Sequence, residues 1–300
     1  MMRIGMIGLG KMGYNLLQNM NDHKIEVYGY DVNKEILEKA KQDGFTVYES
    51  FDDLLKNETG RKILWVMLPA GKITNQVLDQ LVKSVNKGDI VIDGGNSDHR
   101  DSLKYNELFT KKGINYFDVG TSGGVSGARN GASYMIGGNK EVYEEIEDLF
   151  KLTAKEGGYI YTGEAGSGHY LKMVHNAILY GMMQTIGEGF ELLHASQFNY
   201  DLHEVAESLS KSSVIRGWLM ELVANAFGKS PNLEEIKGIV SSSKSTQWTL
   251  DSACSLGVPL PTIAMSLFMR QRSKQDDSFS AKVIASLRDE VGGHSAVKAK

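Results

Sequence analysis

The chain has a single cysteine, Cys254, among its 300 residues. One cysteine excludes an intrachain disulfide framework and a zinc site built on cysteines. No apolar run reaches the ~18 residues that a membrane span needs. The apolar start of the chain is interrupted by Arg3 and Lys11, so we interpret it as a buried strand rather than a signal peptide. We expect a cytoplasmic protein without a membrane segment.

Basic charge is also scarce, because 33 lysines and arginines face 37 acidic residues and the net charge is −4. This balance argues against a nucleic-acid partner. The seven histidines show no metal-binding spacing, and we expect no metal site. An apolar content of 41% with 23% charged residues is typical of a folded globular protein. Glycine is abundant, at 33 residues, which favours tight turns where the backbone approaches a ligand.

Short apolar runs alternate with charged amphipathic segments through the first half of the chain. This pattern predicts a parallel sheet covered by helices on both faces. The expected strands are Arg3–Gly8, Ile25–Tyr30, Lys62–Leu68, Asp89–Asp93, Asn115–Val119, Ala132–Ile136 and Tyr159–Tyr161. After a glycine-rich stretch that begins at Gly163, only helices are expected: His169–Gln197, Leu202–Ser210, Val214–Ala226, Thr249–Ser255, Thr262–Gln275 and Ala281–Arg288. We predict a Rossmann-like, doubly wound α/β domain over residues 1–163 and an all-helical domain over residues 164–300.

A dinucleotide-binding motif follows the first strand: Gly8, Leu9, Gly10, Lys11, Met12 and Gly13. Its glycines allow a tight turn, close approach of a pyrophosphate and close packing of helix on strand. Asp31 ends the second strand, 18 residues after Gly13, and is placed to accept hydrogen bonds from ribose hydroxyls. Val32 follows, and no arginine is there to meet a 2′-phosphate, which predicts NAD as the cofactor.

Two further segments come at the carboxyl ends of expected strands, where doubly wound sheets bind ligands. They are Leu68-Pro69-Ala70 and the stretch that contains Asn96.

The long helix carries a polar stripe in an otherwise apolar sequence. Lys172, His175, Asn176, Leu179 and Tyr180 share one face at helical spacing. A buried lysine loses its charge easily and can serve as a general base. We expect Lys172, with His175 and Asn176, to carry the chemistry.

These motifs together resemble the decarboxylating 6-phosphogluconate dehydrogenases, in their short NAD-dependent form. The matching residues are Gly8–Gly13, Asp93–Ser97, Ser122-Gly123-Gly124, Gly127-Ala128-Arg129, Gly168-His169, Lys172–Asn176, Phe268-Met269-Arg270 and Arg288–His294. The resemblance covers essentially the whole chain in order. It implies oxidation of 6-phospho-D-gluconate to ribulose 5-phosphate, CO2 and NADH.

The resemblance also implies roles for individual residues. Lys172 resembles the base that takes the hydroxyl proton while hydride passes to the nicotinamide. The residues that resemble carboxylate and hydroxyl contacts are Asn96, Ser122, Gly123, Gly124, His175 and Asn176. Tyr180 and Arg270 resemble phosphate contacts. Arg288 and His294 resemble tail residues that reach a neighbouring subunit's site, which implies a homo-oligomer, a dimer or a tetramer.

Departures from the family pattern bear on the reaction, because carboxylates that the family's short members have are lost at Ser126, in the stretch Ser243–Trp248 and at Leu179. The family has a glutamate, the acid that protonates the enediol after decarboxylation, where this chain has Leu179. Three interpretations stay open. The chain is a 6-phosphogluconate dehydrogenase with a slow or water-mediated last protonation. It acts on another anionic 3-hydroxy acid, with or without loss of CO2. Or it is a weakly active protein that binds NAD and ligand.

Overall fold

The computed structural model describes residues 2–57, 59–292 and 297. The chain divides into two compact units, Met1–Asn176 and Ala177–Lys300. Each is described by itself. None of the described helices is long and apolar enough to cross a membrane.

The first unit is built on one eight-stranded sheet with the strand order β3-β2-β1-β4-β5-β6-β7-β8. The strands are β1 (Arg3–Ile7), β2 (Glu26–Tyr30), β3 (Thr46–Tyr48), β4 (Ile63–Val66), β5 (Ile90–Asp93), β6 (Asn115–Ser122), β7 (Ala132–Gly138) and β8 (Ala154–Gly163). The first six pair in parallel, and β7 runs antiparallel to β6. The chain reverses its direction of winding between β1 and β4, and such a reversal opens a crevice at the carboxyl ends of the strands.

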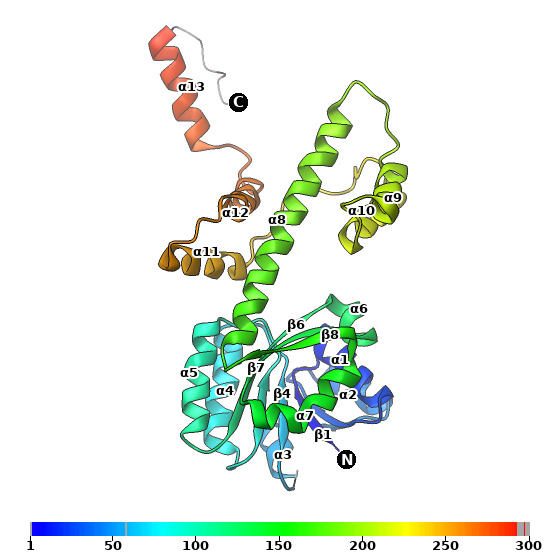
Figure 1. Ribbon diagram of the computed structural model, residues 1–300, viewed down its shortest axis with the longest axis vertical. Helices are drawn as coiled ribbons and strands as arrows, with labels where there is room; N and C mark the ends of the chain where they lie inside the picture. The colour runs from blue at the N-terminus through cyan, green and yellow to red at the C-terminus, as the bar shows by residue number, and fades with distance from the viewer. Residues whose placement is uncertain (1, 58, 293–296, 298–300) are drawn as a thin grey trace. The chain divides into compact units, whose positions relative to one another are not determined.

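Helices cover both faces of this sheet (Figure 1). They are α1 (Lys11–Asp22), α2 (Lys34–Gln42), α3 (Phe51–Lys56), α4 (Lys72–Ser84), α5 (His99–Thr110), α6 (Gly124–Asn130) and α7 (Lys140–Thr153). One apolar cluster joins α1 and α7 to the sheet around Trp65 and Phe150. A second cluster joins α4 and α5 to the other face around Tyr105 and Phe109. The two layers confirm the doubly wound α/β fold.

The sequence pattern missed one strand and shortened three others, ending β6 at Val119 and β7 at Ile136 and giving only the middle of β8. β3 has only three residues, none of them fully buried, so the sequence contains no apolar run that would predict it. β8 begins at Ala154, although the pattern indicates a strand only from Tyr159. The extra residues are mostly exposed, and of these only Ala154 is in register with β7, opposite Ala132; an irregularity follows before Tyr159 pairs with Tyr134. Pairing between distant segments, which the local pattern does not contain, defines this strand.

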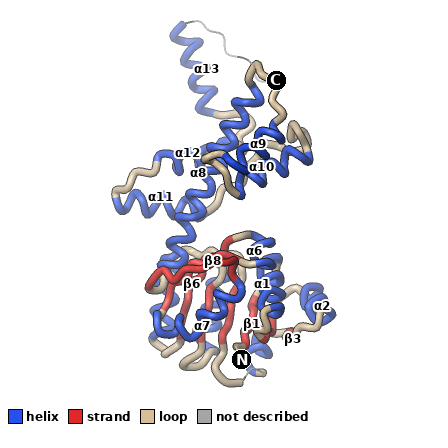
Figure 2. The backbone as a smooth tube through the Cα atoms, turned by 45° about the vertical axis from the view of Figure 1, so that its right-hand side comes forward, coloured by secondary structure: helices blue, strands red, loops and turns tan. Residues whose placement is uncertain are grey.

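The second unit contains only helices and loops over its described residues (Figure 2). Its helices are α8 (Ser167–Ala195), which starts in the first unit, α9 (Leu202–Ser212), α10 (Trp218–Lys229), α11 (Lys244–Leu256), α12 (Pro261–Arg272) and α13 (Phe279–Gly292). Phe190 of α8 and Phe227 of α10 meet in its apolar core. The expectation that α10 starts at Val214 is wrong. Gly217 precedes the helix at φ 149°, a conformation that a side chain would strain.

Candidate active site

The glycine turn between β1 and α1 has the geometry that a pyrophosphate needs. Gly8 has φ 97°, and a Cβ there would lie 2.5 Å from the Met67 carbonyl oxygen. A Cβ on Gly13 would lie 2.0 Å from the Gly8 carbonyl oxygen. Gly10, by contrast, has nothing within 4 Å of its Cβ position, and no side chain caps the N-terminus of α1. The turn therefore leaves open space in front of free backbone N–H groups, which suits a dinucleotide.

Asp31 lies over this turn at the end of β2. Its carboxylate accepts hydrogen bonds from the backbone N–H of Leu9, at 2.7 Å, and of Asn33, at 2.8 Å. The neighbouring Val32 is 85% exposed. A half-buried carboxylate fixed in this way can accept hydrogen bonds from two ribose hydroxyls. It would repel a phosphate at the same position.

The loops after β4 and β5 meet at the same edge of the sheet. A Cβ on Gly95 would lie 3.1 Å from the Leu68 carbonyl oxygen. The Pro69 carbonyl oxygen accepts a hydrogen bond from the Thr74 hydroxyl at 2.8 Å, which ties the loop with Ala70 to α4. Asn96 is exposed beyond them. These contacts place Leu68–Ala70 and Asn96 side by side, where the sequence predicted cofactor contacts.

The next loop along the edge follows β6. Ser122 ends the strand, and Gly123 and Gly124 have φ values of 105° and 62°. Gly123 could not take a side chain, because its Cβ would lie 2.9 Å from the Gly127 Cα. The backbone at this turn is accessible, which is compatible with hydrogen bonding to a carboxylate.

Lys172 is a lysine buried at the end of the first unit. Its side chain is 5% exposed, and burial lowers the pKa of its ammonium group to about 8. About a tenth of the amine is then neutral at pH 7, so it can accept a proton. The neighbouring His175 imidazole donates to the Asn176 Oδ1 at 3.1 Å. Burial, and secondarily Lys172, lowers the pKa of His175, so the neutral fraction of both groups is larger than in water.

Tyr180 and Arg270, which the resemblance gives as phosphate contacts, lie against each other in the second unit. The guanidinium carbon of Arg270 lies 4.1 Å from the centre of the Tyr180 ring, and Arg270 also donates to the Ser241 carbonyl oxygen at 2.9 Å. The stacked guanidinium keeps donors for an anion. Arg288 is exposed on α13, and His294 lies outside the described residues.

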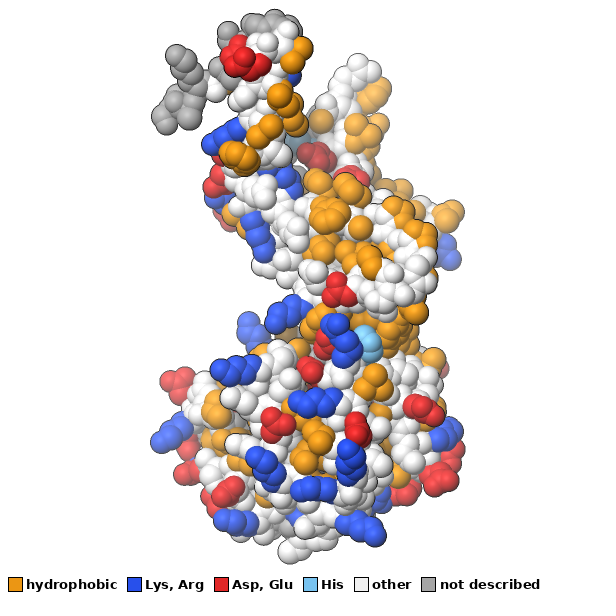
Figure 3. Space-filling model, turned by 90° about the vertical axis from the view of Figure 1, so that its left-hand side faces the viewer, with side chains coloured by type: hydrophobic (Ala, Val, Ile, Leu, Met, Phe, Trp, Pro, Cys, Tyr) orange, Lys and Arg blue, Asp and Glu red, His pale blue; other side chains and the backbone are white. Residues whose placement is uncertain are grey.

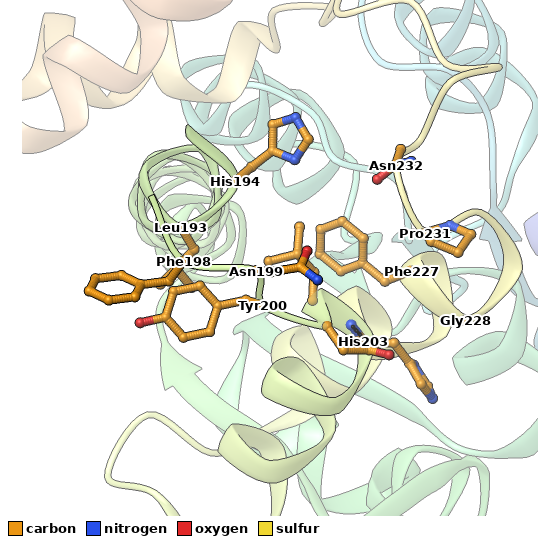
Figure 4. A pocket seen from close by; sticks show the side chains of 12 residues that line it. Leu193, His194, Phe198, Asn199, Tyr200, His203, Phe227, Gly228, Pro231 and Asn232 are labelled. Carbon is orange, nitrogen blue, oxygen red and sulfur yellow. Dashed lines mark hydrogen bonds between the residues drawn. The ribbon is translucent and has the colours of Figure 1, made fainter. Parts of the chain in front are cut away.

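The second unit also encloses a cavity of ≈ 400 Å³ between α8, α9 and α10. Figure 4 shows His194, Phe227 and His203 around it. A neighbouring apolar groove of ≈ 480 Å³ is lined by Met183, Ile186 and Leu222. None of the residues that the sequence singled out lines either cavity. Among the described residues, no cluster of three acidic, histidine or cysteine side chains could hold a metal.

The sequence did not single out Asp118 and Gly120, which contact the start of α8 from β6. The one available signal was an aspartate in the middle of an apolar strand, because a buried carboxylate needs hydrogen-bond donors. Nothing in the pattern indicated which element supplies them.

A dinucleotide turn, a buried lysine and a helical second unit define a hydroxy-acid dehydrogenase that acts on a CH–OH group. Two family models match: the NAD-binding domain of 6-phosphogluconate dehydrogenase over residues 3–163, and the 6-phosphogluconate dehydrogenase C-terminal domain over residues 168–295. The chain belongs to the 6-phosphogluconate dehydrogenase family, and residues 3–163 form its NAD-binding domain.

Individual relatives agree with the family. A Bacillus subtilis (strain 168) protein named "Putative 6-phosphogluconate dehydrogenase YqeC" is 48% identical, over 99% of this chain and 100% of that protein. The NAD(+)-dependent, decarboxylating enzyme of Haloferax volcanii is 37% identical, over 99% of both chains. The Plasmodium falciparum 6-phosphogluconate dehydrogenase structure matches with a TM-score of 0.82 and 28% identity, over 99% of this chain and 66% of that one. Longer relatives therefore have segments that this chain does not match.

Proposed function

We propose that the protein oxidises 6-phospho-D-gluconate with NAD and releases CO2, giving ribulose 5-phosphate and NADH. The observation that carries the proposal is Lys172, a buried amine with a pKa of about 8, on the helix that also bears His175 and Asn176. Of the two relatives of similar length, the Bacillus subtilis protein is named a putative 6-phosphogluconate dehydrogenase, and the Haloferax volcanii enzyme is named NAD(+)-dependent and decarboxylating. Arg270 and Tyr180 would supply contacts for the phosphate.

The residues of this chain have distinct tasks in that reaction. NAD, held by the turn at Gly8–Gly13 and by Asp31, supplies the hydride acceptor when bound. Lys172 takes the proton from the substrate hydroxyl as a neutral amine. Asn176 and His175 hold substrate hydroxyls through their hydrogen-bonding groups, and Ser122, Gly123 and Gly124 hold the carboxylate. After the C–C bond breaks, the protonated Lys172 returns its proton to the substrate oxygen.

The acid for the last proton transfer, to carbon, is missing from its family position on α8. Leu179 is half-buried and carries no acidic proton, where family members have a glutamate. This observation favours a second candidate, oxidation of a different anionic 3-hydroxy acid, with or without loss of CO2. A third, slow turnover in a protein that chiefly binds NAD and ligand, has only the same observation behind it.

The first experiment is NADH formation from 6-phosphogluconate with collection of CO2, run in parallel with NADP. One CO2 for each NADH supports the proposal and implies a proton donor other than residue 179. NADH without CO2 contradicts the proposed decarboxylation and indicates a reaction that stalls or is redirected after oxidation. NAD binding with no NADH formed from 6-phosphogluconate contradicts the proposal and favours either the second candidate, with another substrate, or the third, a protein that chiefly binds NAD and ligand.

Cofactor choice should depend on Asp31 and Val32. We expect the double variant Asp31→Asn, Val32→Arg to shift the ratio of kcat/KM for NADP over NAD upward by about 10²-fold, because a like-charge contact costs several kcal/mol. Val32→Arg alone is the control, since it adds the guanidinium and leaves the carboxylate in place. If the single and double variants shift the ratio equally, Asp31 does not select the cofactor.

We also propose that the protein is a homo-oligomer in which α13 contacts a second copy. Its exposed apolar side chains share one side of the helix: Phe279, Val283, Ile284, Leu287 and Val291, each 43–87% exposed. Figure 3 shows hydrophobic side chains along this helix. A 14-residue helix is marginal in water by itself, and contact with a second copy would stabilise it. The apolar groove lined by Met183 and Leu222 offers a complementary surface on the other copy.

Leu287→Glu is expected to lower the mass measured by light scattering to that of a single chain, because it places a charge in the apolar contact. Ala281→Glu is the matched control, since Ala281 lies on the other side of α13 and is exposed. If the family's tail contribution holds here, Leu287→Glu also reduces kcat/KM by removing Arg288 and His294 from a neighbour's site. An unchanged mass for Leu287→Glu would exclude this surface.

A further inference from the structure

The first turn of α8 is capped by a side chain from the sheet. Asp118 of β6 is fully buried, and its two carboxylate oxygens accept hydrogen bonds from the backbone N–H groups of Gly166, at 2.6 Å, and His169, at 2.7 Å. The N–H groups at a helix start have no acceptor within the helix. An N-cap usually comes from the residue just before the helix. Here it comes from the strand below and so joins the helix to the sheet.

Glycines let the helix start lie directly on the backbone of the sheet. A Cβ on Gly168 would lie 2.3 Å from the Asp118 carbonyl oxygen, and a Cβ on Gly137 of β7 would lie 2.6 Å from the Asp118 Oδ1. A Cβ on Gly120 would lie 2.4 Å from the Lys172 Cβ and 2.7 Å from its Cγ. The stem of the lysine therefore rests on the strand only because residue 120 has no side chain.

We propose that Asp118 and Gly120 are positioning residues for the base. Asp118 fixes the first turn of α8, and Gly120 provides the surface on which the Lys172 side chain is held and kept from water. Neither residue contacts substrate in this assignment. The inference rests on the proposed role of Lys172 in oxidation, and it adds how the fold sets the position and burial of that amine.

The cause of the Lys172 pKa shift indicates that Asp118 acts on Lys172 through packing and not through its own charge. Burial is the cause of the lowered Lys172 pKa. His175 is the titratable neighbour whose own pKa responds to Lys172. Around Asp118 the titratable groups are His169, whose Nδ1 lies 2.8 Å from the Ser102 hydroxyl, and Tyr116. Burial raises the Asp118 pKa, while His169 and the backbone donors oppose that rise. Two backbone N–H groups point at the Asp118 carboxylate. In an asparagine at this position, the side-chain NH2 group would face one of these N–H groups, so two donors would oppose each other.

The test uses two variants of the full-length chain, Asp118→Asn and Gly120→Ala. The titration of Lys172 is followed by NMR of [¹³Cε]lysine-labelled protein, with the resonance assigned from Lys172→Arg. We expect the Lys172 midpoint to rise by about one unit in each variant as water reaches the amine. At pH 7 a unit corresponds to about tenfold less neutral base. Hence kcat for NADH formation should fall about tenfold, while the KM for NAD stays unchanged.

The matched control for Asp118 is Asp89→Asn. Asp89 is also buried and accepts from two backbone N–H groups, Lys62 and Asn86, each at 2.8 Å, but at the amino end of β5. The control for Gly120 is Gly189→Ala, an exposed position on α8 with nothing within 4 Å of the new methyl group. Neither control should move the Lys172 midpoint, whatever it does to stability.

The NMR titration separates this inference from the proposed function. If wild-type protein does not turn over 6-phosphogluconate, the function fails, yet the Lys172 midpoints still test the positioning. If Asp118→Asn does not fold, Gly120→Ala carries the same expectation with the carboxylate intact. Midpoints in the folded variants that match the wild type and the two controls would overturn the proposal.

Discussion

Lys172→Met is expected to lower kcat for NADH formation by about 10²–10⁴-fold, the range for removal of a general base. The thioether cannot accept the hydroxyl proton, but its unbranched chain can occupy the space of the lysine stem above Gly120. NAD binding should be retained, because the turn at Gly8–Gly13 and Asp31 are untouched. Stopped-flow NADH absorbance and calorimetric titration of NAD make the two measurements.

The same assignment fixes the pH dependence of the reaction. Burial lowers the pKa of Lys172 to about 8, and the base acts when neutral. Consequently kcat should rise about tenfold per pH unit below 8 and level off above it. Lys62→Met is the control, since Lys62 is also a buried lysine of the first unit but precedes β4 at the amino edge of the sheet. An active Lys172→Met enzyme, or a profile without this rise, would remove Lys172 from the role of base.

Leu179→Glu has the second large expected effect. If the missing acid limits the last proton transfer, a carboxylic acid at this position should accelerate release of ribulose 5-phosphate by up to about 10²-fold, the low end for general acid catalysis. The acid must be protonated to donate, so the gain should fade as the pH rises through its pKa. The experiment measures the yield of ribulose 5-phosphate and CO2 per NADH in wild type and variant.

Leu179→Gln is the matched control, because glutamine has the size and polarity of glutamate but no acidic proton. A gain for glutamate alone supports proton donation from residue 179. Equal gains for both variants would point to a packing or polarity effect instead. If neither variant changes rate or product, the account of the missing acid is wrong, and another group or water already supplies the proton.

Local chemistry allowed much of this to be predicted from the residues. The turn at Gly8–Gly13 follows from the conformational freedom of glycine and from its place between an apolar strand and a helix. The shared face of Lys172, His175 and Asn176 follows from the helical period. These features depend on neighbours within a few residues, so the sequence pattern contains them directly. Their roles in the reaction remain predictions until the variants are measured.

Other parts of the site depend on contacts between distant segments. Nothing near Lys172 in the chain indicates that its stem lies on Gly120, or that Asp118 caps the helix that carries it. The stacking of Arg270 on Tyr180 joins α12 to α8 in the same way. α10 starts at Trp218, after a turn that ends at Gly217 with a positive φ, and hydrophobic periodicity does not reveal this turn.

The sequence by itself determined the class of fold, the dinucleotide turn, the acid at Asp31 and the helix that carries Lys172. Each of these depends on the spacing of residues along one or two adjacent elements. The tertiary structure decided how strongly Lys172 is buried, and therefore its pKa, because burial is a property of every segment packed around a side chain. A lysine with an ordinary pKa would be almost fully protonated at pH 7. The packing of α8 on β6 and β7 buries this lysine and lowers its pKa, which the proposed role as a base requires.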